Sequence, residues 1–293
     1  IDGELEAERI VPQAVEGLEE AKQSVRNRVI WLKRLTEMEQ RKSESYRMLG
    51  LIKRSLKNDG FLLYYQPVVE LENGKVSHYE ALLRLVDLEN DDIILPNKFI
   101  AVAEKYGLMN EIDFRVFEKA LDGLNSFPDI NLYINLSAVS LGDEELLEKM
   151  ARRIVDSDLK PERLGFEITE TAAVRDLVVA ERWIKKFKLL NCNFALDDFG
   201  TGFSSFSYLK MLPVDTIKID GFFVKNINKD SVARVMVEAI KNVGQSMGKK
   251  VAAEFVESEQ ILNVLQEMNI DLGQGYYLGK PAKTPLPLNL KGD

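Results

Sequence analysis

The sequence predicts an α/β fold, a barrel in which about eight strands alternate with helices. Two observations support this prediction. From Gly60 onward, short apolar segments alternate with longer segments of helical periodicity, which is typical of parallel strands joined by helical crossovers. The chain has 293 residues, and barrels of this class often form one unit of about 250 residues. We therefore expect one large domain preceded by a small N-terminal segment.

Residues 1–57 differ in character from the rest of the chain. Apolar residues from Val11 to Ala21 recur at helical spacing, Val29–Leu32 predicts a short strand, and the charged stretch 34–57 predicts a helix that ends before Asp59-Gly60. We interpret residues 1–57 as a helix–strand remnant with a linker helix, and residues 58–293 as the barrel. An amphipathic linker packed on its neighbour is the simpler alternative.

The first two strands of the barrel are expected to form an antiparallel hairpin, because only a short segment with the turn Asn73-Gly74 separates Leu62–Val69 from Ser77–Leu85. The further strands are short apolar runs, expected at Leu132–Ser137, Leu164–Ile168, Asn193–Asp197, Thr216–Ile219, Lys250–Ala253 and around Asp271–Gly273. The helices between them are expected at Pro96–Tyr106, Glu111–Phe127, Asp143–Ser157, Val174–Leu190, Phe203–Leu209, Ser231–Met247 and Ser258–Met268.

Composition excludes several classes of protein. The single cysteine, Cys192, rules out an internal disulfide and a cysteine-rich zinc site, and the single histidine, His78, argues against a histidine metal site or a Ser-His-Asp triad. The net charge of −8 argues against binding of nucleic-acid polymers or anionic lipid. No apolar run is long enough to span a membrane and the start does not resemble a signal peptide, so we expect a cytoplasmic chain. The first residue is not Met, which leaves room for an upstream membrane anchor.

Polar side chains stand where the predicted strands end. In a parallel barrel these ends meet at one mouth, where active sites lie. A single carboxylate there is weak evidence, because most are solvated or cap helices, but the pattern repeats strand after strand. The residues concerned are Glu80, Asn135, Glu167, Asp197, Asp198, Lys218, Glu254 and Gln274.

Five carboxylates at one mouth would repel one another, and repulsion of this kind raises pKa values. The cluster therefore either holds protons or binds divalent cations. Oxygen ligands with an amide suit Mg²⁺ or Mn²⁺, whereas the histidine and cysteine ligands of zinc are missing. The adjacent Asp197 and Asp198 allow one carboxylate to bridge two ions, as in two-metal phosphoryl-transfer sites.

Lys218 lies between Ile217 and Ile219 on a predicted strand, so it points to the opposite face from both. If the isoleucines face the helices, Lys218 points into the barrel, where the carboxylates would pair with it; a surface lysine is the alternative. The glycine-rich segment Phe199–Ser205 offers backbone N–H groups to an anion or acts as a lid, and a flexible turn is the simpler reading.

Three motifs together resemble the EAL domain family of bacterial cyclic di-GMP phosphodiesterases: Glu80-Ala81-Leu82, DDFGTGFSSFSYL at 197–209 and IKID at 217–220. The resemblance runs from about Leu62 to Pro281. It implies a modified TIM (β/α)8 barrel with one antiparallel strand. It also implies hydrolysis of one phosphodiester bond of cyclic di-GMP to linear pGpG with Mg²⁺ or Mn²⁺, which lowers the level of this second messenger.

The same resemblance implies a role for each site residue. Lys218 positions the attacking water, Glu254 is a metal ligand or the general base, and Glu170 anchors the loop after the two aspartates. The implied metal ligands are Glu80, Asn135, Glu167, Asp197, Asp198 and Glu254. The implied substrate contacts are Gln66, Leu82, Arg84, Asp220, Glu257 and Gln274.

The sequence departs from the family at Phe255, where the family usually has Gly; we expect its bulk to be tolerated if the ring points outward. Residues 16–32 resemble the end of a GGDEF (diguanylate cyclase) domain, with Val25 in a position usually held by Gly, and this implies an upstream GGDEF or sensor domain. Members of the family often dimerise through the barrel, which implies a homodimer.

Three other functions remain open at this level: a receptor that binds cyclic di-GMP without cleaving it, a barrel enzyme acting on another phosphate ester, and a purely structural barrel. The complete set of ligand residues favours the phosphodiesterase over the receptor. Seven polar groups at the strand ends would be unnecessary in a structural barrel.

Overall fold

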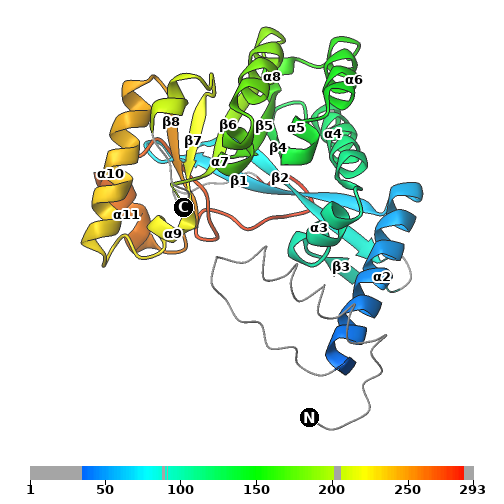
Figure 1. Cartoon of the computed structure of the whole chain (residues 1–293). Coiled ribbons are helices and arrows are strands. Elements are labelled where there is room, and N and C mark those ends of the chain that lie inside the picture. Colours follow the sequence, from blue (N-terminus) through cyan, green and yellow to red (C-terminus); the bar gives the residue numbers. More distant parts are fainter. Residues whose placement is uncertain (1–34, 88–89, 91, 201–205, 287–293) are drawn as a thin grey trace. The chain divides into compact units, whose positions relative to one another are not determined.

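The computed structural model describes residues 35–87, 90, 92–200 and 206–286 (Figure 1). The helix expected at Val11–Ala21 and the strand expected at Val29–Leu32 lie outside these residues. The chain divides into two compact units, residues 1–50 and 51–293. Within the described residues, no helix has the length and apolar character needed to cross a membrane.

Eight strands close into a barrel in the order β1-β9-β8-β7-β6-β5-β4-β2, and β3 adds to the outer edge of β2. Strand β1 is antiparallel to both of its neighbours, whereas the pairs from β2–β4 round to β8–β9 are parallel. The expected modified barrel with one antiparallel strand is therefore confirmed. The bounds are β1 (Phe61–Glu70), β2 (Val76–Asp87), β3 (Asp92–Ile94), β4 (Leu132–Asn135), β5 (Leu164–Thr169), β6 (Asn193–Phe199), β7 (Thr216–Ile219), β8 (Lys250–Ala253) and β9 (Leu272–Gly273).

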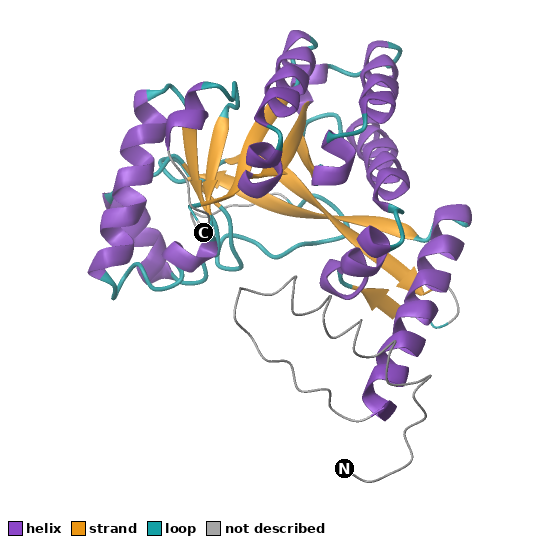
Figure 2. Ribbon diagram, viewed as in Figure 1, coloured by secondary structure: helices purple, strands orange, loops and turns teal. Residues whose placement is uncertain are grey.

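Helices connect the strands and pack on the outside of the barrel (Figure 2). Most begin at an Asp, Ser or Thr whose side chain accepts a hydrogen bond from the first turn, which caps free N–H groups. The bounds are α2 (Leu35–Lys57), α3 (Pro96–Lys105), α4 (Met109–Ser126), α5 (Ala138–Leu141), α6 (Glu144–Val155), α7 (Glu170–Arg175), α8 (Leu177–Leu189), α9 (Gly221–Val224), α10 (Ser231–Ser246) and α11 (Glu259–Glu267), with 3₁₀ turns η1 (Pro161–Arg163) and η2 (Phe206–Lys210).

The structure differs from the sequence-based expectation after β5. One helix was expected over Val174–Leu190, but α7 ends at Arg175 and α8 begins at Leu177. Asp176 between them has φ −145°, and its side chain accepts a hydrogen bond from Val179 N, so it starts a new helix. The elements β3, α5 and α9 were not expected, because three or four residues are too few to show a period.

The inward and outward faces of the strands carry different chemistry. Phe166 of β5 and Phe194 of β6 stack at 5.4 Å and contact Phe187 of α8, so these aromatic side chains fill the layer between strands and helices. The neighbouring residues in sequence point the other way, because successive side chains of a strand alternate. This alternation directs Glu167 into the barrel.

Close packing inside the barrel requires a glycine at one position. Gly165 pairs with Tyr133 across β4 and β5, and a Cβ atom on Gly165 would lie 2.4 Å from the Tyr133 ring. That ring is stacked on His78 with centroids 3.9 Å apart, so it cannot move freely. Burial lowers the pKa of His78 to about 3, which leaves its ring neutral in this apolar stack.

We predict that Gly165→Ala lowers the free energy of unfolding by about 1–3 kcal/mol, the usual cost of overpacking a core. The matched control is Gly142→Ala, whose added Cβ would meet its nearest atom at an ordinary 3.5 Å. Urea denaturation of both variants measures the difference. Equal midpoints would contradict the tight packing.

Candidate active site

Five acidic side chains and one lysine converge at the carboxyl-terminal end of the barrel strands. Lys218 comes from β7, between Ile217 and Ile219, and it points into the barrel while Ile217 lies against Gly244 of α10. The carboxylates come from four other strands or their ends: Glu80 from β2, Glu167 from β5, Asp197 and Asp198 from β6, and Glu254 from the residue after β8.

Lys218 lies at the centre of the cluster and is only 2% exposed. Its Nζ is 2.5 Å from Glu167 Oε2 and 3.0 Å from Glu254 Oε1. It is also 3.2 Å from Asp197 Oδ1 and 3.3 Å from Glu80 Oε2. Burial alone would lower the pKa of Lys218, but the surrounding carboxylates outweigh it and hold the pKa well above its usual value.

One ammonium group cannot neutralise this many carboxylates. Burial, with the negative charges of Asp197 and Glu80, raises the pKa of Glu254 to about 8. Burial, with the charges of Asp197 and Asp220, raises the pKa of Asp198 to about 6. Burial also raises the pKa of Glu167 well above its usual value. The excess negative charge of the cluster therefore favours the binding of protons or cations.

Glu80 is the exception, because polar neighbours stabilise its charge. Asn135 Nδ2 and Gln274 Nε2 each donate to a Glu80 carboxylate oxygen at 2.7 Å, and Gln274 also donates to Gln66 Oε1 at 3.2 Å. Burial pushes the pKa of Glu80 upward, but Lys218 and these two donors outweigh burial and bring the pKa below its usual value.

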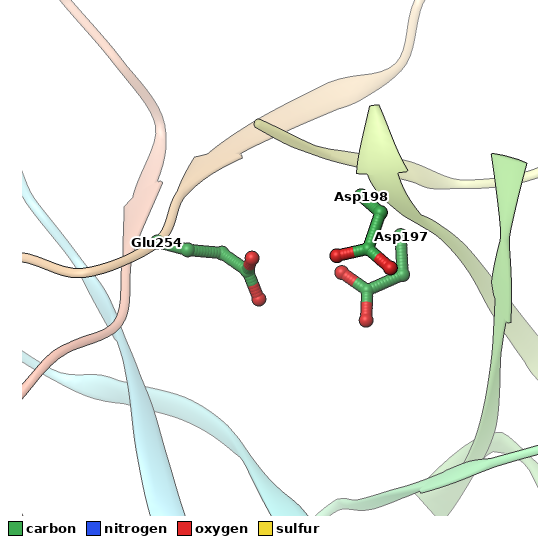
Figure 3. Close-up of side chains that lie close together, drawn as sticks. All are labelled: Asp197, Asp198 and Glu254. Atoms are coloured by element: carbon green, nitrogen blue, oxygen red, sulfur yellow. The ribbon is translucent and has the colours of Figure 1, made fainter. Parts of the chain in front are cut away.

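Three carboxylates are arranged as a cation site would require. One oxygen each from Asp197, Asp198 and Glu254 lies within 4.8 Å of the others, and Figure 3 shows these side chains turned toward one another. Glu167 Oε1 is buried and accepts no hydrogen bond from the described residues, and the buried Asp197 Oδ1 has the Lys218 ammonium at 3.2 Å without a well-aligned hydrogen bond. Buried carboxylate oxygens that are incompletely satisfied fit a hard divalent cation.

A local break in β6 brings both aspartates to the same mouth. Successive strand residues normally point to opposite faces, which would separate Asp197 from Asp198. The register with β7 shifts between Leu196 and Phe199, and Asp198 adopts a left-handed backbone with φ 55°. The irregularity turns the second carboxylate toward the first.

Glu170 does not reach the cation cluster but holds the end of β6. It is the first residue of α7, and its Oε2 accepts a hydrogen bond from Gly200 N at 2.9 Å. The Tyr208 hydroxyl donates to the other oxygen. Glu170 thus joins Gly200, after the end of β6, to Tyr208 of η2, while its implied role of anchoring the loop after the two aspartates stays a prediction.

A cavity of about 380 Å³ opens beside the carboxylates. Five of the six expected substrate contacts line it: Gln66, Leu82, Arg84, Glu257 and Gln274. Arg84 lies 5.1 Å from the centroid of the Tyr64 ring and donates to Leu83 O, which orients its guanidinium. The sixth, Asp220, does not line the cavity; it caps α9 by accepting from Phe222 N at 2.7 Å.

Four residues that line the cavity were not assigned from sequence: Phe255, Gly275, Tyr276 and Pro281. Tyr276 and Pro281 belong to the segment GYYLGKP at the end of the resemblance, and Phe255 departs from the family pattern. Either feature of the sequence could have pointed to these residues as part of the site. Two larger hollows, of about 670 and 620 Å³, have neither Lys218 nor any of the five clustered carboxylates in their lining. We therefore assign the site to the smaller cavity.

Comparison with known proteins gives a consistent answer. The EAL domain profile matches residues 51–281. The chain is 40% identical over 235 residues to the cyclic di-GMP phosphodiesterase PdeB of Shewanella oneidensis, covering 78% of this chain and 27% of that protein. It is 35% identical over 234 residues to the cyclic di-GMP phosphodiesterase PdeA of Borreliella burgdorferi, covering 78% and 35%. The chain thus spans about a third or less of the length of these relatives.

Solved structures share the fold. The PaMucR phosphodiesterase in its c-di-GMP complex aligns with a TM-score of 0.75 and 32% identity, covering 80% of this chain and 97% of that one. The FimX EAL domain from Pseudomonas aeruginosa bound to c-di-GMP aligns with a TM-score of 0.76 and 30% identity, covering 81% and 97%. With the barrel, the acidic mouth and the profile match in agreement, the chain belongs to the EAL domain family.

Proposed function

We propose that this chain hydrolyses one phosphodiester bond of cyclic di-GMP to give linear pGpG, and so lowers the level of this messenger in bacterial signalling. The observation that carries the proposal is the cluster of four carboxylates around the buried Lys218, with Asp198 next to two of them, beside a cavity that Arg84 lines. The names of the relatives PdeB and PdeA support the activity, and the two c-di-GMP complexes support the ligand.

The acidic cluster supports a requirement for Mg²⁺ or Mn²⁺, and we propose that two ions bind. The proposed ligands are Glu80, Asn135, Glu167, Asp197, Asp198 and Glu254. When bound, the cations would neutralise the phosphate charge and lower the pKa of water. Asp197 would hold a cation together with Asp198 and Glu254, with which it forms a group of three close carboxylates.

The chain's own groups would orient the reactants. The Lys218 ammonium is a donor only, so we assign it the task of holding the attacking water through the water's oxygen. Glu254 lines the cavity and serves either as a ligand or as the base that takes the proton of that water. Arg84 presents a planar pair of donors suited to a phosphate oxygen.

The remaining roles concern substrate and loop placement. We assign Gln66, Leu82, Glu257 and Gln274 to substrate contacts, and Glu170 to positioning the end of β6. Asp220 is the weakest of the proposed contacts, because its side chain caps α9. We further propose that residues 58–293 are the catalytic barrel, that residues 1–57 link it to an upstream GGDEF or sensor domain, and that the barrel works as a cytoplasmic homodimer.

The direct test is incubation of the chain with cyclic di-GMP and Mg²⁺ or Mn²⁺, with pGpG followed by chromatography. We expect pGpG to form only with the cation and to stop when a chelator is added. Tight binding without product would instead identify a receptor, the alternative function. If the chain does not bind cyclic di-GMP and forms no pGpG, the proposed substrate is wrong.

We predict that Glu80→Gln lowers kcat by more than about a hundredfold, because loss of the outer partners of metal ligands already costs ten- to a hundredfold. The amide keeps the shape of the side chain, so the circular dichroism spectrum should not change. Glu148→Gln, in a surface pair with Lys186, is the matched control and should keep full activity. Wild-type turnover by Glu80→Gln would exclude Glu80 as a ligand.

The acidic cluster also predicts a pH-dependent stabilisation by metal. Because the pKa values of Glu254 and Asp198 are raised to about 8 and about 6, the metal-free folded state holds protons that the unfolded state has released. The contribution of these two groups to the free energy of unfolding of the metal-free protein is therefore fully present at acidic pH. It is lost as the pH rises toward about 8. Metal binds the deprotonated ligands, so the rise of Tm with Mn²⁺ should be larger at pH 8 than at pH 6. A larger rise at pH 6 would contradict this.

A further inference from the structure

Phe255 has an unusual backbone for its residue type. Among the described residues, five that are not glycine have positive φ; four are Asp or Asn, and the fifth is Phe255 at φ 54°. Asp and Asn tolerate this conformation, whereas a bulky residue adopts it only when its surroundings impose it. Backbone strain of this kind concentrates at functional sites, and Phe255 directly follows Glu254.

The surroundings that hold Phe255 are well defined. A Cβ atom on Gly221 would lie 2.1 Å from the Phe255 ring, so the ring occupies the space that only a glycine leaves open. Lys225 Nζ lies 3.9 Å from the ring centroid, a cation–π contact. On the chain itself, Glu254 N donates to Ile219 O and Val256 N donates to Gln274 O, which fixes the backbone on both sides.

The held ring forms part of the wall of the cavity beside the carboxylates. Phe255 is 42% exposed, a large value for a phenylalanine fixed on two sides. The cavity wall also carries charged groups such as Arg84, Asp198 and Glu257, which suit phosphate and cations. Its apolar surface comes from Leu82, Pro281 and the rings of Phe255 and Tyr276, and of these two rings Phe255 is the one next to the carboxylate Glu254 in sequence. An aromatic side chain can stack on any nucleobase, because every base has an aromatic face.

We propose that Phe255 is a substrate-binding contact whose ring packs against one guanine base of the bound cyclic dinucleotide. Lys225 and Gly221 hold the ring in place for this contact. The inference rests on the proposed function, since it takes cyclic di-GMP as the ligand. It assigns to this chain a substrate contact at the position where the family usually has Gly.

The test compares Phe255→Leu with Phe255→Tyr in the full chain. Phe255→Leu keeps an apolar side chain but loses the ring, and we expect KM for cyclic di-GMP to rise about tenfold with kcat within about twofold, as for loss of one base–aromatic contact. Phe255→Tyr keeps the ring and should recover most of the lost affinity. Phe222→Leu is the matched control: Phe222 is 75% exposed, does not line the cavity and should leave KM unchanged.

Two further readouts separate a substrate contact from a structural role. The Mn²⁺ concentration for half-maximal activity and Tm should be the same in Phe255→Leu and wild type. If both change together with kcat, Phe255 acts by positioning Glu254, and the proposal is wrong. A lower KM in Phe255→Leu would show that the ring obstructs the cavity, which also overturns it. Phe255→Met replaces the leucine variant if the latter does not fold.

Failure of the proposed function is distinguishable from failure of this inference. If the wild type binds cyclic di-GMP but makes no pGpG, calorimetric Kd values of the same variants replace KM, and the expected tenfold loss still applies. If the wild type cleaves the substrate and Phe255→Leu has an unchanged KM, the proposed function stands and the contact is wrong. A wild type that does not bind cyclic di-GMP at all overturns both.

Discussion

The buried ammonium of Lys218 is the interaction on which the mouth of this barrel depends. Removing a charge from water costs several kcal/mol, and a buried ion pair offsets that cost only when its partners are close and well oriented. Here the partners come from β2, β5, β6 and the end of β8, so one side chain joins strands around the ring. Without Lys218, those carboxylates would be left buried and mutually repulsive.

The same cluster carries more negative charge than Lys218 can neutralise, and this excess favours the binding of a cation. Asn135 and Gln274 satisfy Glu80, which keeps that carboxylate ionised. Glu167 retains a buried oxygen that accepts no hydrogen bond from the described residues, and the buried Oδ1 of Asp197 has an ion-pair contact with Lys218 but no well-aligned hydrogen bond. A site that satisfies some of its acceptors and leaves others open favours a divalent cation over a further protein donor.

Two departures from regular backbone lie beside the carboxylates at this end of the barrel, at Asp198 and Phe255. The shifted register of β6 turns Asp198 toward Asp197, and Glu170 secures the end of that strand through Gly200 N. Phe255 takes a left-handed conformation immediately after Glu254. The regular part of the barrel makes this possible, because the outward aromatic layer of Phe166, Phe187 and Phe194 holds the strands while their ends are distorted.

The sequence alone determined the alternation of strands and helices, the antiparallel start of the barrel at Asn73-Gly74 and the polar residues at the strand ends, because each follows from local period and turn chemistry. Only the tertiary structure decided which groups meet. Lys218 and Glu80 are 138 residues apart, and no local pattern encodes their ion pair. Likewise, Asp176 divides what the apolar period predicts as one helix. The position of Phe255 depends on Gly221 and Lys225, which lie at the two ends of α9. Contacts of this kind depend on register and packing between distant segments, which a single sequence does not display.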